Sequence, residues 1–515
     1  MRVTIAPSHI SGALSAPPSK SMAHRALICA ALAEGESHIT NLSGSEDISA
    51  TCRALTLLGA KFTPEGENGV CVTGTGGHIA APEVPVDCGE SGSTLRFLIP
   101  VFARCGKPIT FTGHGRLMER PQTVYAELFK ACSIPFSHTD EAIRVYGALP
   151  AGSYTVRGDV SSQFISGLLF ALPLARGTRG ESDQQGKSNT QGENIVRGTH
   201  NESVLHITPP FESRSYIALT LAALADFGIA ARFGDENTIC IDRNQKYAPC
   251  NYTVEGDYSQ AAFLAVLGAL CGGVTVTGLR PDTKQGDAAI LDILARCGAQ
   301  FTRAGGTCSG SSSSNGSCSG GTPSSDTSSG GTPSGNTSSV GTSSGGTPSG
   351  DTSSGGTPSG NISSGGTCAG DAVTFEKSTL HGTRIDLADC PDLGPVLMAL
   401  GAFCAGETVI ENAGRLRLKE SDRIEAMETE LRKLGADISS TPDTVTIRGG
   451  ALHGASDLCG HNDHRVVMAL TVAALAAGVP AAINGAEAVR KSWPGFFAAI
   501  RTLGAEIAEQ PEAVE

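Results

Sequence analysis

The stretch Lys433-Leu-Gly-Ala-Asp-Ile438 occurs in six versions along the chain, and its recurrence decides the predicted fold. Each version ends an amphipathic helical pattern and leads into a short strand-like segment. Glycine is the expected residue where a helix closes in a left-handed turn before the next strand. The small residues at this turn are Gly59, Ser133, Gly228, Gly298, Gly435 and Gly504. The sequence therefore predicts six copies of one α/β unit.

The spacing of these turns supports a long repeat. Successive turns are 74, 95, 70, 137 and 69 residues apart, and each of the two long intervals contains an insertion. The larger insertion, residues 305–370, repeats a Ser-Gly-Gly-Thr-Pro-Ser-Gly phrase and has nothing to form a core. We expect it to be a disordered loop that replaces a hairpin turn between strands at 299–302 and 372–375. A smaller insertion of similar character covers about 179–201.

Composition restricts the classes of function. The chain has 515 residues, enough for two or three domains, and a net charge of −13 argues against a nucleic-acid-binding surface. No apolar run is long enough for a membrane span, and residues 1–5 are typical of a strand rather than a leader peptide. The 16 cysteines show neither paired spacing nor a Cys/His cluster. We expect a cytoplasmic protein that has no nucleic-acid or membrane partner and no metal.

Charge is densest in Arg415-Leu-Arg-Leu-Lys-Glu-Ser-Asp-Arg423. This stretch follows a strand-like segment at 407–412 and precedes a helical pattern, so it lies at a strand-to-helix junction. Cations beside two carboxylates suit an anionic substrate that also needs proton transfer. Leu416 and Leu418 alternate with the basic residues, which predicts one buried face. The alternative interpretation is a run of solvated surface charges.

Polar and basic residues also stand at the expected starts of several helices. Free backbone N–H groups and the helix dipole favour phosphate at such positions. One such site is commonplace, but about one in each of six units indicates that helix N-termini converge on a shared cleft. The stretches are 17–25, 88–96, 113–121, 158–164, 212–216, 389–393, 462–465 and 489–494.

Read together, these stretches resemble the 5-enolpyruvylshikimate-3-phosphate synthase family, enolpyruvyl transferases of the shikimate pathway. The resemblance is collinear over the whole chain apart from the two insertions. It is carried by Pro18-Ser-Lys-Ser with His24-Arg25, Gly89-Glu-Ser-Gly-Ser-Thr-Leu-Arg96, Arg116 with Glu119-Arg-Pro121, Ser161-Ser-Gln163, Pro391-Asp392, Leu418-Lys-Glu-Ser-Asp-Arg423, Asn462-Asp-His-Arg465 and Lys491-Ser-Trp-Pro494.

The resemblance implies a two-domain inside-out α/β barrel with six βαβαββ units, three in each domain. Domain I would comprise residues 1–18 and 254–515, and domain II residues 19–253. The chain would cross between the domains near 18–20 and 252–256. The cleft between them would close over two anionic substrates.

The resemblance also implies roles for individual residues. The catalytic residues would be Lys20, Asp392, Lys419 and Glu420, with Asp392 and Lys419 meeting the attacking 5-hydroxyl and Glu420 protonating the methylene carbon. Shikimate 3-phosphate would be bound by Lys20, Ser21, Arg25, Ser161, Ser162, Gln163, Ser213, Tyr216, Asp392 and Lys419. Phosphoenolpyruvate would be bound by Lys20, Gly92, Arg120, Gln163, Arg423, Arg465 and Lys491.

In the implied reaction, the 5-hydroxyl of shikimate 3-phosphate adds to C2 of phosphoenolpyruvate as C3 is protonated. Phosphate then leaves the tetrahedral intermediate. Cations can stabilise the carboxylate and the departing phosphate, so neither a metal nor an organic cofactor is expected. Asp392 and Glu420 are expected in different environments, because an acid and a base must act on opposite sides of one carbon centre. The implied protein is a monomer.

Two positions depart from the family pattern. Glu90 and Arg415 stand where the family often has asparagine, so no contact is assigned to either. The rival enzyme is the enolpyruvyl transferase that acts on UDP-N-acetylglucosamine. That enzyme would show a Lys-Asn pair near the start and a reactive cysteine in the loop at 113–121, and this chain has neither. A catalytically inactive phosphosugar-binding protein is the alternative from another class, against which the intact catalytic residues argue.

Overall fold

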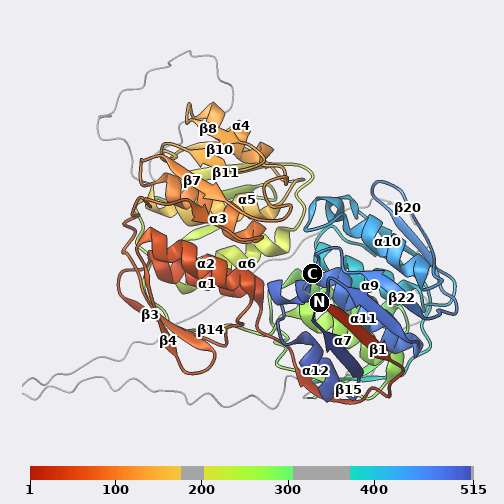
Figure 1. Ribbon diagram of the computed structural model, residues 1–515. Coiled ribbons are helices and arrows are strands. Elements are labelled where there is room, and N and C mark those ends of the chain that lie inside the picture. The colour runs from red at the N-terminus through yellow and green to blue at the C-terminus, as the bar shows by residue number, and fades with distance from the viewer. Residues whose placement is uncertain (176–201, 305–371, 512–515) are drawn as a thin grey trace, which may run out of the picture.

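The computed structural model describes residues 1–175, 202–304 and 372–511 and shows two α/β domains side by side (Figure 1). Each domain has its own hydrophobic core. The core of domain II contains buried residues from Met22 to Val254. The core of domain I contains buried residues from Val3 to Ala16 and from Tyr258 to Ile507. Both predicted insertions, 179–201 and 305–370, lie outside the described residues.

One sheet pattern repeats through the described residues. There are six four-stranded sheets, and in each the first two strands are parallel while the later pairs are antiparallel. In domain II, in spatial order, the sheets are β14 (Tyr252–Thr253), β3 (Glu36–Thr40), β5 (Gly69–Thr73) and β4 (Lys61–Glu65); β6 (Val86–Asp87), β7 (Ile109–Thr112), β9 (Ile143–Val145) and β8 (Phe136–His138); and β10 (Ser153–Arg157), β11 (Glu202–Thr208), β13 (Thr238–Asp242) and β12 (Ala231–Phe233).

Domain I repeats the pattern. Its sheets are β2 (Gly12–Ser15), β15 (Val274–Thr277), β17 (Val373–Glu376) and β16 (Gln300–Arg303); β18 (Arg384–Asp386), β19 (Glu407–Glu411), β21 (Val445–Arg448) and β20 (Asp437–Ser440); and β22 (Ala455–Cys459), β23 (Ala481–Asn484), β1 (Arg2–Ala6) and β24 (Glu506–Gln510). Here too, each sheet begins with a parallel pair and continues with antiparallel pairs.

The six predicted turns are present, one before each edge strand β4, β8, β12, β16, β20 and β24. The backbone φ angle is positive at every one: Gly59 (117°), Ser133 (56°), Gly228 (75°), Gly298 (93°), Gly435 (92°) and Gly504 (97°). Glycine carries no Cβ and adopts this conformation readily, whereas serine is rare there. The prediction of six equivalent units, three in each domain, is therefore confirmed.

Three sheets are completed by strands that are distant in sequence. β14 pairs with β3, β2 pairs with β15, and β1 lies between β23 and β24; in Figure 1 the red N-terminal strand lies among blue C-terminal ones. The two segments that cross between the domains run together, because Ser19 N donates to Glu255 O at 2.8 Å and Asp257 N donates to Pro17 O at 2.8 Å. This pairing fixes where the two domains meet.

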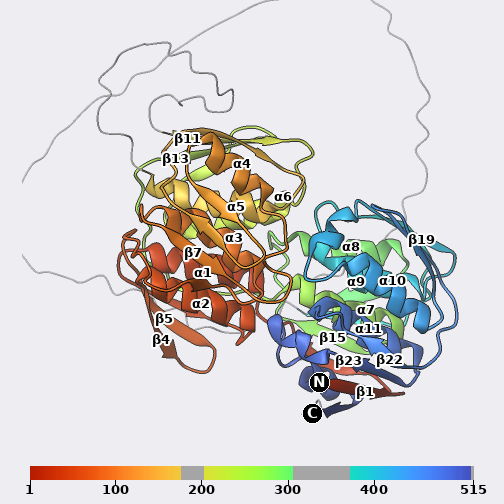
Figure 2. The ribbon, with the colours of Figure 1, turned by 45° about the horizontal axis from the view of Figure 1, so that its top comes forward.

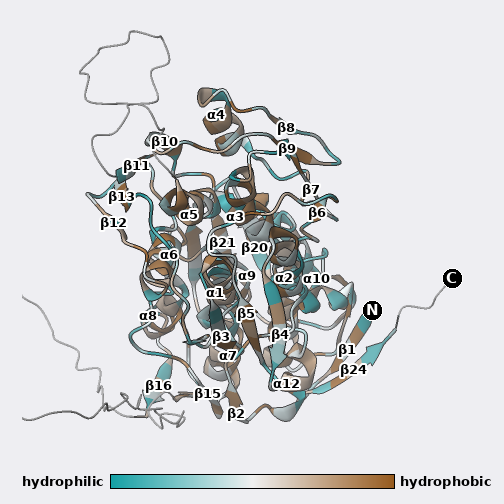
Figure 3. Ribbon diagram, turned by 90° about the vertical axis from the view of Figure 1, so that its left-hand side faces the viewer, coloured by the Kyte–Doolittle hydropathy of each residue, from teal (hydrophilic) through white to brown (hydrophobic). Residues whose placement is uncertain are grey.

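The helices fill the interior of each domain (Figure 2). Helices α1, α7 and α11 are buried along nearly their whole length. A helix that is surrounded by other elements is expected to be apolar on all sides. The helix α5 is a further example, since much of it has the hydrophobic colour in Figure 3. The helices are α1 (Lys20–Leu32), α2 (Glu46–Leu58), α3 (Gly92–Ala103), α4 (Thr123–Ala131), α5 (Ser162–Ala171), α6 (Arg214–Asp226), α7 (Tyr258–Cys271), α8 (Ala289–Arg296), α9 (Gly394–Gly401), α10 (Arg423–Lys433), α11 (His464–Ala477) and α12 (Phe496–Thr502). Across the described ranges, none of them has both the length and the apolar character needed to cross a membrane.

Candidate active site

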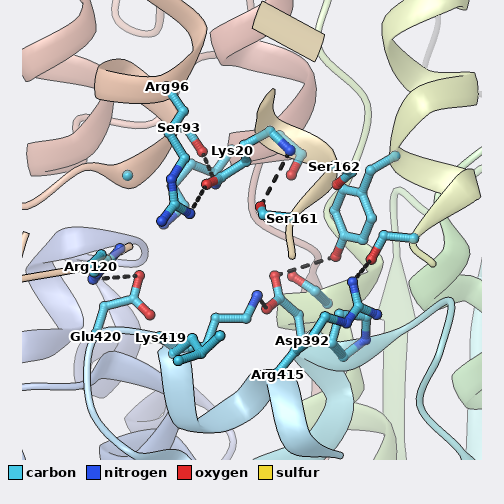
Figure 4. Close-up of a pocket in the computed structure, with 18 of the residues that line it drawn as sticks. Lys20, Ser93, Arg96, Arg120, Ser161, Ser162, Asp392, Arg415, Lys419 and Glu420 are labelled. Carbon is cyan, nitrogen blue, oxygen red and sulfur yellow. Dashed lines mark hydrogen bonds and ion pairs between the residues drawn. The ribbon is translucent and has the colours of Figure 1, made fainter. Parts of the chain in front are cut away.

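A pocket that is partly open to solvent lies between the two domains (Figure 4). Its walls carry the first residues of α1, α3, α5 and α6 from domain II and of α7, α10 and α11 from domain I. Serine or aspartate side chains cap six of these helices: Ser19, Ser91, Ser161, Asp257, Asp422 and Asp463. The positive ends of several helix dipoles therefore face one pocket, which favours an anionic ligand.

The pocket brings together all but one of the residues implicated by the sequence. The lining includes Lys20, Ser21, Arg25, Gly92, Arg120, Ser161, Ser162, Gln163, Ser213, Tyr216, Asp392, Lys419, Glu420, Arg423 and Arg465. Lys491 is the exception. It is the last residue of a 3-10 helix, η5 (Ala486–Lys491), and the next α-helix begins only at Phe496. The prediction that Lys491 stands at the front of a helix is therefore wrong, and its ammonium group contacts Glu90 instead, at 2.6 Å.

Asp392 is surrounded by cations from domain I. Its carboxylate accepts from Lys419 Nζ at 3.2 Å, Arg423 Nη1 at 3.1 Å and Arg465 Nη2 at 3.0 Å. Burial alone would raise the pKa of Asp392, but Arg465, Lys419 and Arg423 together hold that pKa well below its usual range. Asp392 is therefore ionised and able to accept a hydrogen bond from a substrate hydroxyl.

Glu420 is also surrounded by cations. It accepts from Arg423 Nη2 at 2.8 Å and lies 3.6 Å from Arg120 Nη2 of the opposite domain. Burial again acts to raise the pKa, and Arg120 and Arg423 outweigh it, so the pKa of Glu420 lies well below its usual range. The two carboxyls share the Arg423 guanidinium but differ in their other cations, which are Lys419 and Arg465 at Asp392 and Arg120 at Glu420.

The charged stretch 415–423 lies at the predicted strand-to-helix junction, between β19 and α10. Its first part forms a 3-10 helix, η4 (Gly414–Leu418), rather than an extended segment. Leu416 is fully buried but Leu418 is 44% exposed and lines the pocket. The prediction of one buried leucine face is wrong for Leu418, because residues two apart do not share a face when a turn takes three residues.

On the side of domain II, Arg25 is a buried connector between α1 and α6. Its guanidinium donates to Ser21 O at 2.7 Å, Thr220 Oγ1 at 2.8 Å and Tyr216 O at 3.0 Å. Three of its N–H groups are thus committed to the protein. Arg25 fixes the position of Ser21 and Tyr216, and burial lowers its pKa to about 10.

Sequence reasoning missed several residues in or beside the pocket. Asp287 is buried and accepts a 2.8 Å hydrogen bond from Tyr216 OH, which also lies 3.3 Å from Asp392 Oδ2. Burial, followed by the nearby Asp392 carboxylate, raises the pKa of Asp287 to about 7. Asp287 lies in the short 3-10 helix η2 (Gly286–Ala288), directly before α8, and this helix-start signal was not used in the sequence analysis. Other lining residues that were given no role are Asp47, Ser93, Arg96, Asp257, Ser259, Arg415 and His464.

Comparisons with known proteins agree with this architecture. The family model described as EPSP synthase (3-phosphoshikimate 1-carboxyvinyltransferase) matches residues 5–189, 193–317 and 364–500. A 3-phosphoshikimate 1-carboxyvinyltransferase from Clostridium kluyveri is 37% identical over 509 residues, which cover 98% of each chain. One from Clostridioides difficile is 34% identical, again with 98% of each chain covered.

Solved structures of lower sequence identity share the fold. An EPSP synthase structure from Acinetobacter baumannii superposes with a TM-score of 0.68 at 22% identity, covering 99% of this chain and 100% of that one. An enolpyruvyl transferase from Streptomyces tendae does so with a TM-score of 0.66 at 15% identity, covering 98% of both chains. Because the family model and the clostridial relatives match almost from end to end, the chain belongs to the EPSP synthase (3-phosphoshikimate 1-carboxyvinyltransferase) family.

Proposed function

We propose that this chain transfers the enolpyruvyl group of phosphoenolpyruvate to the 5-hydroxyl of shikimate 3-phosphate and releases phosphate. The observation that carries the proposal is the interdomain pocket, which gathers Asp392, Glu420, Lys20 and Lys419 around one space. The cations of the pocket, Lys20, Arg25, Arg96, Arg120, Arg415, Lys419, Arg423 and Arg465, outnumber its carboxylates, Asp47, Asp257, Asp392 and Glu420. That excess of positive charge suits two anionic substrates, although the whole chain is acidic.

In the proposed addition step, Asp392 accepts the proton of the 5-hydroxyl while the hydroxyl oxygen bonds to C2 of phosphoenolpyruvate. The electrons of the C2–C3 double bond take a proton from Glu420 at C3. In the elimination step Glu420 takes a proton back from C3, the double bond re-forms and the C2–O bond to phosphate breaks. The proton on Asp392 then passes to the departing phosphate. Lys20, Arg120 and Lys419 stabilise the negative charges during both steps.

Glu420 must be protonated before it can act as the acid, and the substrate itself can bring this about. Arg120 and Arg423 hold the Glu420 carboxyl ionised. The phosphate and carboxylate of phosphoenolpyruvate would pair with the same cations and weaken their hold on Glu420. The pKa of Glu420 would therefore rise when the substrate binds.

The domain boundaries and the closure of the cleft belong to the same proposal. We place domain I at residues 1–18 and 254–515 and domain II at 19–253. The crossing segments, which pair through Ser19–Glu255 and Asp257–Pro17, support these limits. The two domains close on the substrates because cations from both face the pocket. We also propose that the protein is cytoplasmic and monomeric.

An assay of phosphate release from phosphoenolpyruvate tests the activity. Release should require shikimate 3-phosphate and should not occur with UDP-N-acetylglucosamine. The Lys20→Ala variant should lose at least ~100-fold in kcat/KM for each substrate, because the ammonium group is proposed to contact both. Release that depends on UDP-N-acetylglucosamine, or no release with either acceptor, would refute the proposal.

A further inference from the structure

Glu90 and Arg415, the two positions that depart from the family pattern, both reach across the cleft. Glu90 lies in the turn before α3 in domain II. Its carboxylate lies 2.6 Å from Lys491 Nζ and accepts from Asn462 Nδ2 at 2.9 and 3.2 Å, and both partners belong to domain I. A neutral asparagine at position 90 could not form this ion pair.

The Glu90 contact fixes a buried ammonium group. Lys491 is only 5% exposed, and its other acceptor is the main-chain oxygen of Asn462, at 2.7 Å. A buried cation is costly unless it is paired and hydrogen-bonded. Glu90 therefore determines where the Lys491 ammonium group points.

Arg415 makes the reverse connection, from domain I to domain II. Its guanidinium forms an ion pair with Glu212 and donates to Ser213 Oγ at 2.8 Å. It also donates to Ala388 O at 2.6 Å, and the Ser213 main-chain N donates to that same oxygen at 3.0 Å. Ser213 has a φ of 54°, in a region that serine seldom adopts, so its conformation depends on such outside contacts.

We propose that Glu90 and Arg415 are positioning residues, each of which holds a substrate-binding residue of the opposite domain in place. Glu90 holds Lys491, the residue assigned to phosphoenolpyruvate that lies outside the lining of the pocket. Arg415 holds Ser213, on the side assigned to shikimate 3-phosphate. This inference rests on the proposed function, because the family resemblance implies the roles of Lys491 and Ser213 in binding its two substrates. Each contact also joins the domains, so each substrate site is completed only when both domains are in place.

Steady-state kinetics of Glu90→Gln and Arg415→Gln test the proposal, because both variants remove a charge and keep a polar side chain. Glu90→Gln should raise KM for phosphoenolpyruvate about 10-fold and change KM for shikimate 3-phosphate by less than about twofold. Arg415→Gln should raise KM for shikimate 3-phosphate about 10-fold and change KM for phosphoenolpyruvate by less than about twofold. Matched controls are Glu34→Gln and Arg384→Gln, which remove charges from exposed ion pairs with Lys246 and Glu411. Neither control should change either KM.

A second measurement does not depend on turnover. Trp493 is the single tryptophan of the chain and follows Lys491 by two residues. Its fluorescence should change in Glu90→Gln and stay unchanged in Arg415→Gln. If Glu90→Gln fails to fold, the Asn462→Asp variant is measured in its place. This change puts a second carboxylate opposite Glu90 and keeps the main-chain oxygen of residue 462 that contacts Lys491.

The outcomes separate this inference from the proposed function. Equal rises of both KM values in both variants would indicate general weakening of the cleft and overturn the inference. A lower KM for phosphoenolpyruvate in Glu90→Gln would also overturn it, since Glu90 would then compete with the substrate for Lys491. Absence of phosphate release in the wild type would refute the proposed function alone, and the fluorescence of Trp493 would still decide whether Glu90 positions the segment around Lys491.

Discussion

Arg423 links the two proposed catalytic carboxyls. Its buried guanidinium donates to Asp392 at 3.1 Å, to Glu420 at 2.8 Å and to Asp463 at 2.8 Å. A planar guanidinium offers donors in fixed directions, so the separation of Asp392 and Glu420 is set by one rigid group. Their other partners differ, since Lys419 and Arg465 contact Asp392 while Arg120 of the opposite domain lies near Glu420.

Substitution of the two carboxyls should separate these roles. Glu420→Gln keeps the shape of the side chain but cannot cycle a proton, so kcat should fall by roughly 100- to 10,000-fold while both substrates still bind. Solvent deuterium exchange into the methylene of phosphoenolpyruvate should fall with it. Asp392→Asn should also weaken the binding of shikimate 3-phosphate, which titration calorimetry would measure. Glu425→Gln, at an exposed position in α10, the helix that follows Glu420, is the control. Near-normal exchange in Glu420→Gln would show that another group protonates C3.

Asp287 should make stability depend on pH. Its pKa is raised to about 7 in the folded protein, against about 3.9 for an unperturbed aspartate. Between these pH values the folded state binds more protons than the unfolded state, so the free energy of unfolding falls as pH rises. Asp287→Asn removes this penalty and keeps an oxygen that can accept from Tyr216. The difference in Tm, variant minus wild type, should therefore become more positive from pH 5 to pH 8. The exposed Asp282→Asn should show no such trend, and an identical trend in both variants would contradict the assignment.

At the scale of elements, the local sequence predicted the features that depend on neighbouring residues, such as helix ends and turns. The six turns were predictable because a left-handed residue ends each helix, and Ser133 shows that the position matters more than the residue type. Leu418 and Lys491 were mispredicted because both end 3-10 helices, whose period of three leaves no clear pattern in a short stretch. Asp287 was missed because its partner Tyr216 lies 71 residues away and in the other domain. Contacts of that kind become visible only when the domains are assembled.

The hairpin of β16 and β17 makes the larger insertion testable. Phe301 pairs with Phe375 and Arg303 with Val373, and Ala304 N donates to Ala372 O at 2.9 Å, so the two ends of the insertion lie together. A short turn can join such ends. Replacing residues 306–370 with Asn-Gly should therefore leave kcat and Tm nearly unchanged. A variant that removes only residues 319–353 serves as the control for chain length. Loss of soluble enzyme in the full replacement would show that the insertion supports the fold.

At the scale of the whole molecule, cationic side chains of both domains face each other across the cleft. Lys20 and Arg120 come from domain II, while Arg423 and Arg465 come from domain I. Carboxylates compensate part of this charge, since Asp47 pairs with Lys20 and Arg423 pairs with Asp392, Glu420 and Asp463. Two anionic substrates would supply the rest, which couples their binding to the approach of the domains.

Closure of the cleft should therefore require both substrates. Shikimate 3-phosphate and phosphoenolpyruvate together should raise Tm by more than the sum of their separate effects, because each completes a site that the other helps to close. Small-angle X-ray scattering should show a smaller radius of gyration with both ligands than with either alone. Sodium chloride at equal ionic strength is the control. In Lys20→Ala, the excess of the joint Tm shift over the sum of the separate shifts should be smaller than in the wild type. Strictly additive shifts, with an unchanged radius of gyration, would mean that the two domains hold one arrangement and that binding does not depend on their approach.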